Sequence, residues 1–331
     1  MKAIVPVAGI GTRLRPHTYT YPKPLLTVAG KPILSYVLEP LLQCEPDEVI
    51  FVIGFKSELI RRYVESHYSF KATFVQQDEL LGLGYAVRLG MESIDRGPVL
   101  VILGDTIVDC DLGDFLRTGD STLTVCQTSD PKRFGIADIQ NGVVIGVEEK
   151  PERPKTNLAL IGCYYIKESE MLKVELDNLT RSHKTGDGEI QLTDALAAMI
   201  RNGVKFVPHE VEHWLDCGKK ETLLETNHYI LARQGAPAAI DGSVLIPPVY
   251  VAPSARLVDS VIGPDVSVAD EVEISRSVVR NSIIGEGSRI EDCVLEQSLL
   301  GREVIVKGKE EILNIGDSSE VGCTGMDFGG G

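Results

Sequence analysis

Apolar runs alternate with amphipathic segments over the first hundred residues, and this alternation is the feature that most restricts the fold. Runs such as "VIFVI" and "VLVIL" are apolar on both faces of a strand, as expected for a sheet covered by helices on both sides. The predicted strands are residues 2–7, 48–53, 71–76 and 98–103. The predicted helices between them are 32–42, 57–67 and 82–94. We therefore expect an α/β fold with a doubly wound sheet, whose ligands bind beyond the carboxyl ends of the strands.

The pattern changes to hairpin-like strands between residues 122 and 166. Asn141-Gly142 is a strong signal for a two-residue hairpin turn. The stretch "GEIQLTDALAAMIRNG" then predicts a helix that Gly203 ends, and a strand and a helix over 219–234 complete the domain. Together these elements predict a Rossmann-like mixed sheet domain over residues 1–235.

A repetitive segment follows Ser243. Ile262, Val268 and Ile274 fall six residues apart, which suits a parallel β-helix built from hexapeptide repeats. A sandwich of short antiparallel strands is the alternative. The predicted organisation is a linker over 236–245, a β-helix over 246–315 and a flexible tail over 316–331.

Charge and composition limit the partners of the chain. Its 331 residues carry a formal net charge of −15, which argues against nucleic acid as a partner because such binding depends on basic side chains. The sequence has no apolar run of 18 residues and no signal-peptide pattern, so we expect a cytoplasmic protein without a membrane partner. Seven scattered cysteines without a CxxC pair predict reduced thiols rather than disulfides or a zinc site.

The N-terminal region is basic although the chain is acidic. Residues 1–38 hold five Lys or Arg residues and no acidic residue. The glycine-rich turn "AGIGTRLRP" follows a predicted strand and can present backbone amides and arginine side chains to a phosphate. In "YPKPLL" two prolines restrict the backbone around Lys23. A tight turn with solvent-facing arginines, followed by a surface loop, is the alternative interpretation.

Two aspartates are candidates for binding a metal ion. Asp105 in "LGDT" directly follows a predicted strand, and Asp216 lies in "HWLDCG". The pair can share one Mg²⁺, which prefers oxygen ligands and is usually held by one or two carboxylates, substrate phosphates and water. A helix-capping role is the alternative for Asp105. We interpret His213 as a packing or surface residue.

Taken together, these motifs resemble the sugar-phosphate nucleotidyltransferase (nucleotide-sugar pyrophosphorylase) family over residues 1–235. The stretch "GIGTRLRPHTYTYPKPLL" carries the family signature. Its form is most similar to bacterial glucose-1-phosphate uridylyltransferases and thymidylyltransferases. Ala8 stands where many relatives have a second glycine, which leaves the backbone amide in place.

The resemblance implies roles for individual residues on the nucleotide side. Arg13 and Lys23 match the catalytic basic pair that contacts the triphosphate. Gln77 matches the glutamine that reads the base; Gln76 is a rival, and Gln77 is preferred because it lies five residues before Gly82. The nucleotide-binding set implied in this way is Gly9, Gly11, Thr12, Gln77 and Gly82.

The resemblance also implies the sugar-phosphate and metal sites. Lys150 would contact the phosphate of the sugar, and Glu149 its hydroxyls. The implied sugar-phosphate set is Gly135, Glu149, Lys150 and Tyr164, and the implied Mg²⁺ ligands are Asp105 and Asp216. Both substrates are anions, and two unit charges ~4 Å apart repel by ~4 kcal/mol at an effective dielectric constant of ~20. Fixed cations and a metal ion are therefore required.

The implied reaction is Mg²⁺-dependent transfer of a nucleotidyl group from a nucleoside triphosphate, dTTP or UTP, to glucose 1-phosphate. Mannose-1-phosphate guanylyltransferase, another nucleotide specificity such as CTP, and an inactive regulatory paralogue are the alternatives. The repeats resemble left-handed β-helices, which carry acyltransferase activity in some relatives that use a histidine. Here the last histidine is His228, before the repeats, so we expect the β-helix to serve regulation or assembly of a homo-oligomer.

Overall fold

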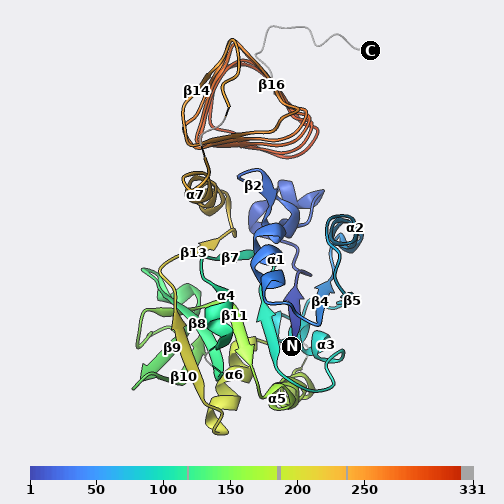
Figure 1. The fold of residues 1–331 in the computed structure, drawn as a ribbon, viewed down its shortest axis with the longest axis vertical. Coiled ribbons are helices and arrows are strands. Elements are labelled where there is room, and N and C mark those ends of the chain that lie inside the picture. Colours follow the sequence, from blue (N-terminus) through green and yellow to red (C-terminus); the bar gives the residue numbers. More distant parts are fainter. Residues whose placement is uncertain (118, 185–187, 236–237, 322–331) are drawn as a thin grey trace. The chain divides into compact units, whose positions relative to one another are not determined.

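The computed structural model describes residues 1–117, 119–184, 188–235 and 238–321, and they form two compact units (Figure 1). Unit 1 comprises Met1–Ile10 and Leu34–Leu215. Unit 2 comprises Gly11–Ile33 and the chain from Asp216 onward. The segment that carries the signature is thus grouped with the C-terminal part of the chain. The domain boundaries given above stay predictions.

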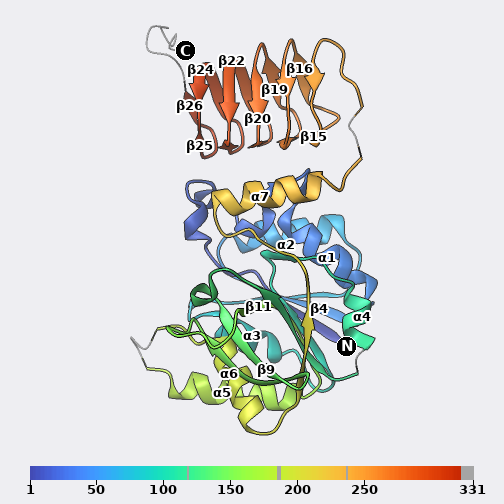
Figure 2. The ribbon, with the colours of Figure 1, turned by 90° about the vertical axis from the view of Figure 1, so that its left-hand side faces the viewer.

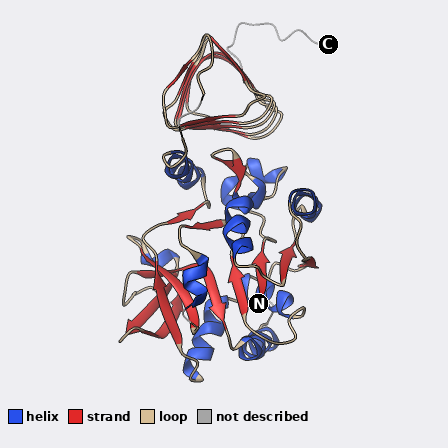
Figure 3. Ribbon diagram, viewed as in Figure 1, coloured by secondary structure: helices blue, strands red, loops and turns tan. Residues whose placement is uncertain are grey.

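Unit 1 is built on one nine-stranded mixed sheet (Figure 3). β1 lies between β4 and β6 and is parallel to both, whereas β11 runs antiparallel to β6 and to β8. In spatial order the strands are β5 (Ala72–Gln76), β4 (Glu48–Ile53), β1 (Lys2–Pro6), β6 (Val99–Ile102), β11 (Leu158–Ile166), β8 (Ser121–Gln127), β12 (Phe206–Glu210), β10 (Val143–Glu149) and β9 (Gly135–Gln140). The predicted doubly wound α/β fold is confirmed.

Among the described residues, helices α1 to α6 belong with this sheet. Helices α3, α5 and α6 contact one another. Each contributes a buried side chain, Val87, Leu172 and Leu196 respectively, to one hydrophobic core. Ile4 and Val101 of the sheet belong to the same core. Burial of these side chains stabilises the unit by roughly 1.5–3 kcal/mol each. The helices are α1 (Ile33–Gln43), α2 (Ser57–His67), α3 (Leu83–Met91), α4 (Leu112–Arg117), α5 (Ser169–Ser182) and α6 (Leu192–Arg201).

Short strands and turns lead from the sheet toward the predicted site residues. β7 (Thr106–Val108) directly follows Asp105, and β13 (Trp214–Asp216) ends on Asp216. Asn141 and Gly142 have φ angles of 52° and 73°, which is the left-handed conformation that a two-residue hairpin turn of type I′ requires. The hairpin predicted from Asn141-Gly142 is therefore confirmed, and it joins β9 to β10.

Unit 2 contains the signature segment from Gly11 onward, helix α7 and the repeats. The signature segment folds into three 3-10 helices, Thr12–Leu14, His17–Tyr19 and Lys23–Leu25, and the hairpin of β2 (Thr27–Val28) and β3 (Lys31–Pro32). Helix α7 covers Lys220–Leu231. The repeats form parallel strands only, so the antiparallel sandwich is wrong.

The repeats wind into a left-handed β-helix with a triangular cross-section (Figure 1). In Figure 2 its strands lie side by side. Val249 pairs with Val266, and Ser267 with Ile283, so one coil takes 16 or 17 residues. The strands are β14 (Val244–Leu245), β15 (Val249–Val251), β16 (Arg256–Val258), β17 (Val261–Ile262), β18 (Val266–Val268), β19 (Glu273–Ser275), β20 (Val278–Arg280), β21 (Ser282–Ile284), β22 (Arg289–Glu296), β23 (Leu299–Leu300), β24 (Ile305–Glu311), β25 (Asn314–Ile315) and β26 (Glu320–Val321).

Apolar side chains fill the β-helix, and Ile262, Val268 and Ile274 are all at most 1% exposed. The six-residue period therefore marks side chains that point inward. β26 pairs with β24 and lies inside the segment predicted as a flexible tail. The last part of that segment, residues 322–331, lies outside the described residues.

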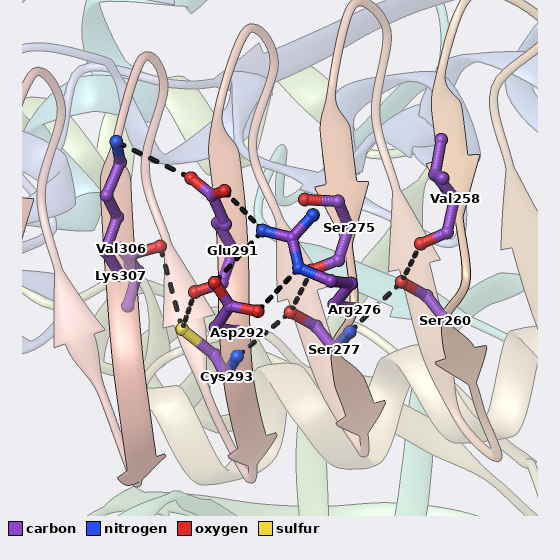
Figure 4. A network of polar contacts seen from close by, with 10 residues as sticks. All are labelled: Val258, Ser260, Ser275, Arg276, Ser277, Glu291, Asp292, Cys293, Val306 and Lys307. Carbon is purple, nitrogen blue, oxygen red and sulfur yellow. Dashed lines mark hydrogen bonds and ion pairs between the residues drawn. The ribbon is translucent and has the colours of Figure 1, made fainter.

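Polar contacts join successive coils of the β-helix (Figure 4). The backbone N–H of Ser277 donates to the Ser260 hydroxyl at 3.2 Å, and that of Cys293 donates to the Ser277 hydroxyl at 3.0 Å. On the outside, the Arg276 guanidinium reaches the carboxylates of Glu291 and Asp292. Each inward serine thus satisfies a backbone donor of the next coil, which removes the cost of burying it unpaired.

One buried carboxylate in unit 1 predicts acid sensitivity. Glu48 accepts from Lys2 at 2.8 Å and from the Thr73 hydroxyl at 2.6 Å. Burial by itself raises the pKa of Glu48, but the hydrogen bonds from Lys2, Thr73 and Lys71 outweigh it and lower this pKa from 4.5 to about 2. The folded state therefore binds fewer protons than the unfolded state between these pH values.

We expect Glu48→Gln to lower the free energy of unfolding at pH 7 by about 2 kcal/mol. The difference from the unaltered protein should shrink as the pH falls from 4.5 toward 2, because the stabilisation belongs to the ionised carboxylate. Urea titrations at pH 7 and pH 3 measure it. Glu65→Gln is the control, since Glu65 is an exposed partner of Arg61 and such pairs contribute little. A difference that does not depend on pH would contradict the assignment.

Candidate functional site

The phosphate-binding residues predicted in unit 2 lie together around Gly11. Its φ of 69° is left-handed, and a Cβ there would lie 3.0 Å from the Lys23 Cβ and 3.1 Å from the Thr18 Cγ2. The Thr18 hydroxyl donates to the Gly11 carbonyl at 2.9 Å. Glycine is therefore required at this position for both conformation and space, and the turn brings Lys23 against Gly11.

Exposure differs among the residues of this loop. Thr12 and Arg13 are exposed, whereas Lys23 is only 7% exposed. Gly9, which belongs to unit 1, is exposed and has nothing within 4 Å of its Cβ position. The backbone at Gly9 is therefore open to close approach by a ligand.

Arg13 and Asp216 meet at Gly218, although they lie 203 positions apart in the sequence. A Cβ on Gly218 would lie 2.8 Å from the Asp216 Oδ1 and 3.0 Å from the Arg13 Nη2. The structure thus brings together one predicted phosphate-binding cation and one predicted metal ligand. Because position 218 has no Cβ, the side chains of Arg13 and Asp216 can occupy their present positions.

The residues predicted to contact the base lie beyond the carboxyl end of β5. Gln77 is buried, and its side-chain amide donates to the Glu79 carbonyl at 3.0 Å, whereas Gln76 is exposed. Gly82 has a φ of 100°, and a Cβ there would lie 2.7 Å from the Glu189 Cβ. Close packing of the segment before α6 therefore explains a glycine at position 82. The choice between Gln77 and Gln76 stays a prediction.

Three of the predicted sugar-phosphate residues form one cluster. Gly135 begins β9 and pairs in register with Glu149, the last residue of β10. A Cβ on Gly135 would lie 3.0 Å from the Glu149 Oε2, and the Lys150 Nζ lies 3.3 Å from the Glu149 Oε1. The antiparallel register of β9 and β10 therefore places the Glu149 carboxylate and the exposed Lys150 ammonium beside the buried Gly135.

Thr193 belongs to this cluster and was missed by the sequence analysis. Its hydroxyl donates to the Glu149 Oε2 at 2.8 Å, and its Oγ1 lies 3.1 Å from the Gly135 Cβ position. The neighbouring Asp194 has its pKa raised, by burial first and by the charge of Glu149 second. The sequence offered only a threonine within a predicted helix, which by itself does not indicate a role.

Tyr164, the fourth predicted sugar-phosphate residue, is buried. It lies in the hydrophobic core of unit 1, and its hydroxyl accepts the backbone N–H of Gly162 at 3.1 Å. Burial raises the pKa of Tyr164 above its usual range, so the phenol keeps its proton at neutral pH. The structure gives its hydroxyl a backbone partner, and its sugar-phosphate role stays a prediction.

The two predicted metal ligands are half-buried aspartates. Asp105 accepts a long hydrogen bond from the Thr106 hydroxyl at 3.4 Å. Among the described residues no three His, Cys, Asp or Glu side chains cluster as a metal site. Mg²⁺ bound with substrate phosphates and water requires only one or two carboxylates. The carboxylate oxygens of Asp105 and Asp216 are the donor type that such an ion takes.

Comparison with known proteins identifies the family. Residues 2–233 match the nucleotidyl transferase family. The chain belongs to this family. The matched range includes all the predicted site residues described above.

Curated relatives extend the similarity beyond the matched range. Glucose-1-phosphate thymidylyltransferases from Streptomyces antibioticus and Streptomyces griseus are each 30% identical, and the alignments cover 97% and 96% of this chain and 99% and 98% of theirs. The low-salt glycan biosynthesis nucleotidyltransferase Agl11 of Haloferax volcanii is 34% identical over 70% of this chain and 66% of its own. The relatives that match nearly end to end thus include the region of the repeats.

Solved structures support the fold. A Bacillus anthracis protein, provisionally described as a glucose-1-phosphate thymidylyltransferase, aligns with a TM-score of 0.61 and 27% identity over 72% of this chain and 98% of its own. A UDP-glucose pyrophosphorylase complexed with UDP-glucose has the same TM-score at 24% identity, over 70% of this chain and 99% of its own. With the family match and the Streptomyces relatives, the chain is an enzyme of the nucleotidyl transferase class. None of its described helices has the length and apolarity needed to span a membrane.

Proposed function

We propose that the chain transfers a nucleotidyl group from dTTP or UTP to glucose 1-phosphate in a Mg²⁺-dependent reaction that releases pyrophosphate. The observation that carries this proposal is the convergence of Arg13 and Asp216 at Gly218, because it joins a phosphate-binding cation to a metal-binding carboxylate. The names of the Streptomyces relatives support the choice of substrates.

The chemistry follows from the charges of the substrates. A phosphate oxygen of the sugar phosphate attacks the α-phosphorus, a new P–O bond forms, and the bond between the α-phosphorus and the α–β bridging oxygen breaks. The attacking phosphate is already ionised, so positioning and electrostatic stabilisation supply most of the catalysis. Arg13 and Lys23 would hold the triphosphate, and the backbone amides at Gly9, Gly11 and Thr12 would contact its oxygens.

The remaining residues would bind the two ends of the product. Gln77 and Gly82 would contact the base, and Glu149 and Lys150 would contact the hydroxyls and phosphate of the sugar. Gly135 leaves room beside Glu149, and Thr193 orients its carboxylate. Bound by Asp105 and Asp216, Mg²⁺ would neutralise charge that develops on the phosphate oxygens.

The decisive experiment measures pyrophosphate release with and without Mg²⁺ over a grid of nucleoside triphosphates and sugar 1-phosphates. We expect the largest kcat/KM with dTTP or UTP and glucose 1-phosphate. Preference for GTP and mannose 1-phosphate would replace the proposed specificity but keep the reaction. Absence of release in every combination would favour a regulatory paralogue. We also propose that the protein is a cytoplasmic homo-oligomer. Light scattering measures the mass of the oligomer.

Lys150→Ala tests the sugar-phosphate role directly. We expect the KM for the sugar 1-phosphate to rise by about 10- to 100-fold, because one charge-assisted contact to a phosphate is lost. The KM for the nucleotide should change far less. Lys155→Ala is the matched control, since Lys155 is an exposed lysine with a 3.9 Å ion pair to Asp138. Equal changes in both KM values would contradict the role of Lys150.

A further inference from the structure

The segment that carries the phosphate-binding residues is grouped with the β-helix in one compact unit. Two sets of contacts hold it there. One involves the last coils of the β-helix, and the other involves α7 and the earlier coils. Neither set is explained by a β-helix that serves only to assemble subunits.

The first set, the terminal-coil contact, joins residues 16–21 to residues 302–317. The buried imidazole of His17 lies with its Nε2 2.9 Å from the Asn314 Oδ1. The Thr20 hydroxyl donates to the Asp317 carboxylate, and the Arg302 guanidinium lies 5.4 Å from the centre of the Tyr21 ring. Residues almost 300 positions apart therefore share one packed surface.

Backbone packing supports the terminal-coil contact. A Cβ on Gly316 would lie 3.1 Å from the Pro16 Cβ. A side chain at position 316 would therefore fit only if Pro16 shifted by a few tenths of an ångström.

The second set, the α7 contact, joins the turn between β2 and β3 to the β-helix. Asn227 of α7 is fully buried, and its Oδ1 accepts both the backbone N–H of Ala29 at 2.9 Å and the Ser267 hydroxyl at 2.6 Å. Its Nδ2 donates to the Asp265 carbonyl at 3.2 Å. A Cβ on Gly30 would lie 2.5 Å from the Tyr250 ring. Both polar ends of the Asn227 amide are therefore used to connect the three elements.

Of the phosphate-binding residues, Lys23 lies between these two contacts in the sequence, and Gly11, Thr12 and Arg13 precede the first. Thr18 follows His17 and holds the Gly11 carbonyl through its hydroxyl, and Gly11 packs against Lys23. A shift at His17 is therefore passed to Thr18, to Gly11 and to the lysine. Reactions that depend on positioned charges lose rate when the charges move by about 1 Å.

We propose that the β-helix is a positioning element for nucleotidyl transfer, holding the phosphate-binding loop through Asn314 and Asn227. The proposal rests on the function given above. Asn314 and His17 are positioning residues rather than catalytic ones, because they act through the loop. The β-helix is thereby a part of the enzyme on which the geometry of the loop depends.

The test compares Asn314→Leu with Asn314→Asp. The leucine variant removes the acceptor for His17, whereas aspartate keeps an oxygen at the same place. We expect Asn314→Leu to lower kcat by about tenfold and to weaken dTTP binding, with the KM for glucose 1-phosphate unchanged. Asn314→Asp should recover most of the loss. Thr20→Val, which removes the hydroxyl bound to Asp317, should act in the same direction.

Arg276→Ala is the matched control. It breaks the outer ion pairs to Glu291 and Asp292 (Figure 4), at a position whose side-chain contacts among the described residues lie within the β-helix itself. Thermal unfolding of all variants is recorded in parallel. Asn314→Leu should lose activity while its unfolding midpoint stays near that of Arg276→Ala.

The outcomes separate this proposal from the proposed function. Normal turnover by the unaltered protein, with unchanged kcat and dTTP affinity in Asn314→Leu, would overturn the positioning role alone. Without turnover in the unaltered protein, calorimetric titration with dTTP decides: weaker binding by Asn314→Leu supports the positioning role, and equal binding overturns it. If the unaltered protein neither turns over nor binds dTTP, both proposals are overturned.

Discussion

Asp216→Asn is expected to lower kcat about a hundredfold or more at ordinary Mg²⁺ concentrations, because a metal ligand loses its charge where negative charge develops. The substitution keeps the shape of the side chain, and Asp216 is only half-buried, so the fold should tolerate it. The Arg13 guanidinium near Gly218 would then lack a neighbouring carboxylate. The measurement is pyrophosphate release as a function of Mg²⁺ concentration.

The Mg²⁺ dependence separates a metal ligand from a residue that only orients Arg13. A metal ligand predicts that raising Mg²⁺ restores part of the lost rate in Asp216→Asn. If both carboxylates bind one ion, Asp105→Asn should behave alike, and the double variant should lose less than the product of the single effects. Glu221→Gln, an exposed carboxylate at the start of α7, is the control. An unchanged rate in Asp216→Asn would remove Asp216 from the metal site.

Elements with a strong local pattern could be predicted closely from the sequence. β4 and α2 have the predicted bounds of 48–53 and 57–67, because a continuous apolar run and a charged amphipathic segment leave few alternatives. The hairpin at Asn141-Gly142 depends on left-handed backbone that asparagine and glycine adopt readily. In these places local preference and tertiary structure agree.

Helix α5 was not predicted although it has 14 residues. Its apolar stripe is narrow, with Leu172 and Leu176 as its fully buried leucines, and the rest of "SEMLKVELDNLTRS" is largely polar. Helix α6 begins at Leu192, later than the predicted start at Gly188, since residues before it pack on Gly82 and Gly84. Both differences come from packing against distant parts of the chain.

The site could be predicted as a set of residues but only partly as an arrangement. The signature predicted a role for Arg13, and the apolar stretch before Asp216 indicated that carboxylate. The proximity of the two side chains at Gly218, however, depends on the fold. The contact between His17 and Asn314 spans 297 positions and has no local signal in either segment. Side chains that support a site are chosen by geometry, so a sequence motif does not mark them.

Arg13→Ala is expected to lower kcat/KM by roughly a hundred- to a thousandfold, the loss found when one donor to a developing oxyanion is removed. Arg13→Lys should recover only part of it, because lysine keeps the charge but not the planar fork that binds two phosphate oxygens. Arg15→Ala is the matched control: Arg15 is exposed two positions away, and its guanidinium lies 5.0 Å from the centre of the Tyr19 ring. We expect it to keep most of the activity.

Gly218→Ala completes this test without removing any charge. Its new methyl group would lie 2.8 Å from the Asp216 Oδ1 and 3.0 Å from the Arg13 Nη2. The first distance is shorter than real Cβ contacts and the second is tighter than most, so both flexible side chains must shift. We expect a loss of kcat between those of Arg15→Ala and Arg13→Ala, with little change in thermal stability. Full activity in Gly218→Ala together with full activity in Arg13→Ala would show that the positive charge used in catalysis lies elsewhere. Activity lost only in Arg13→Ala would mean that the charge matters and its present position does not.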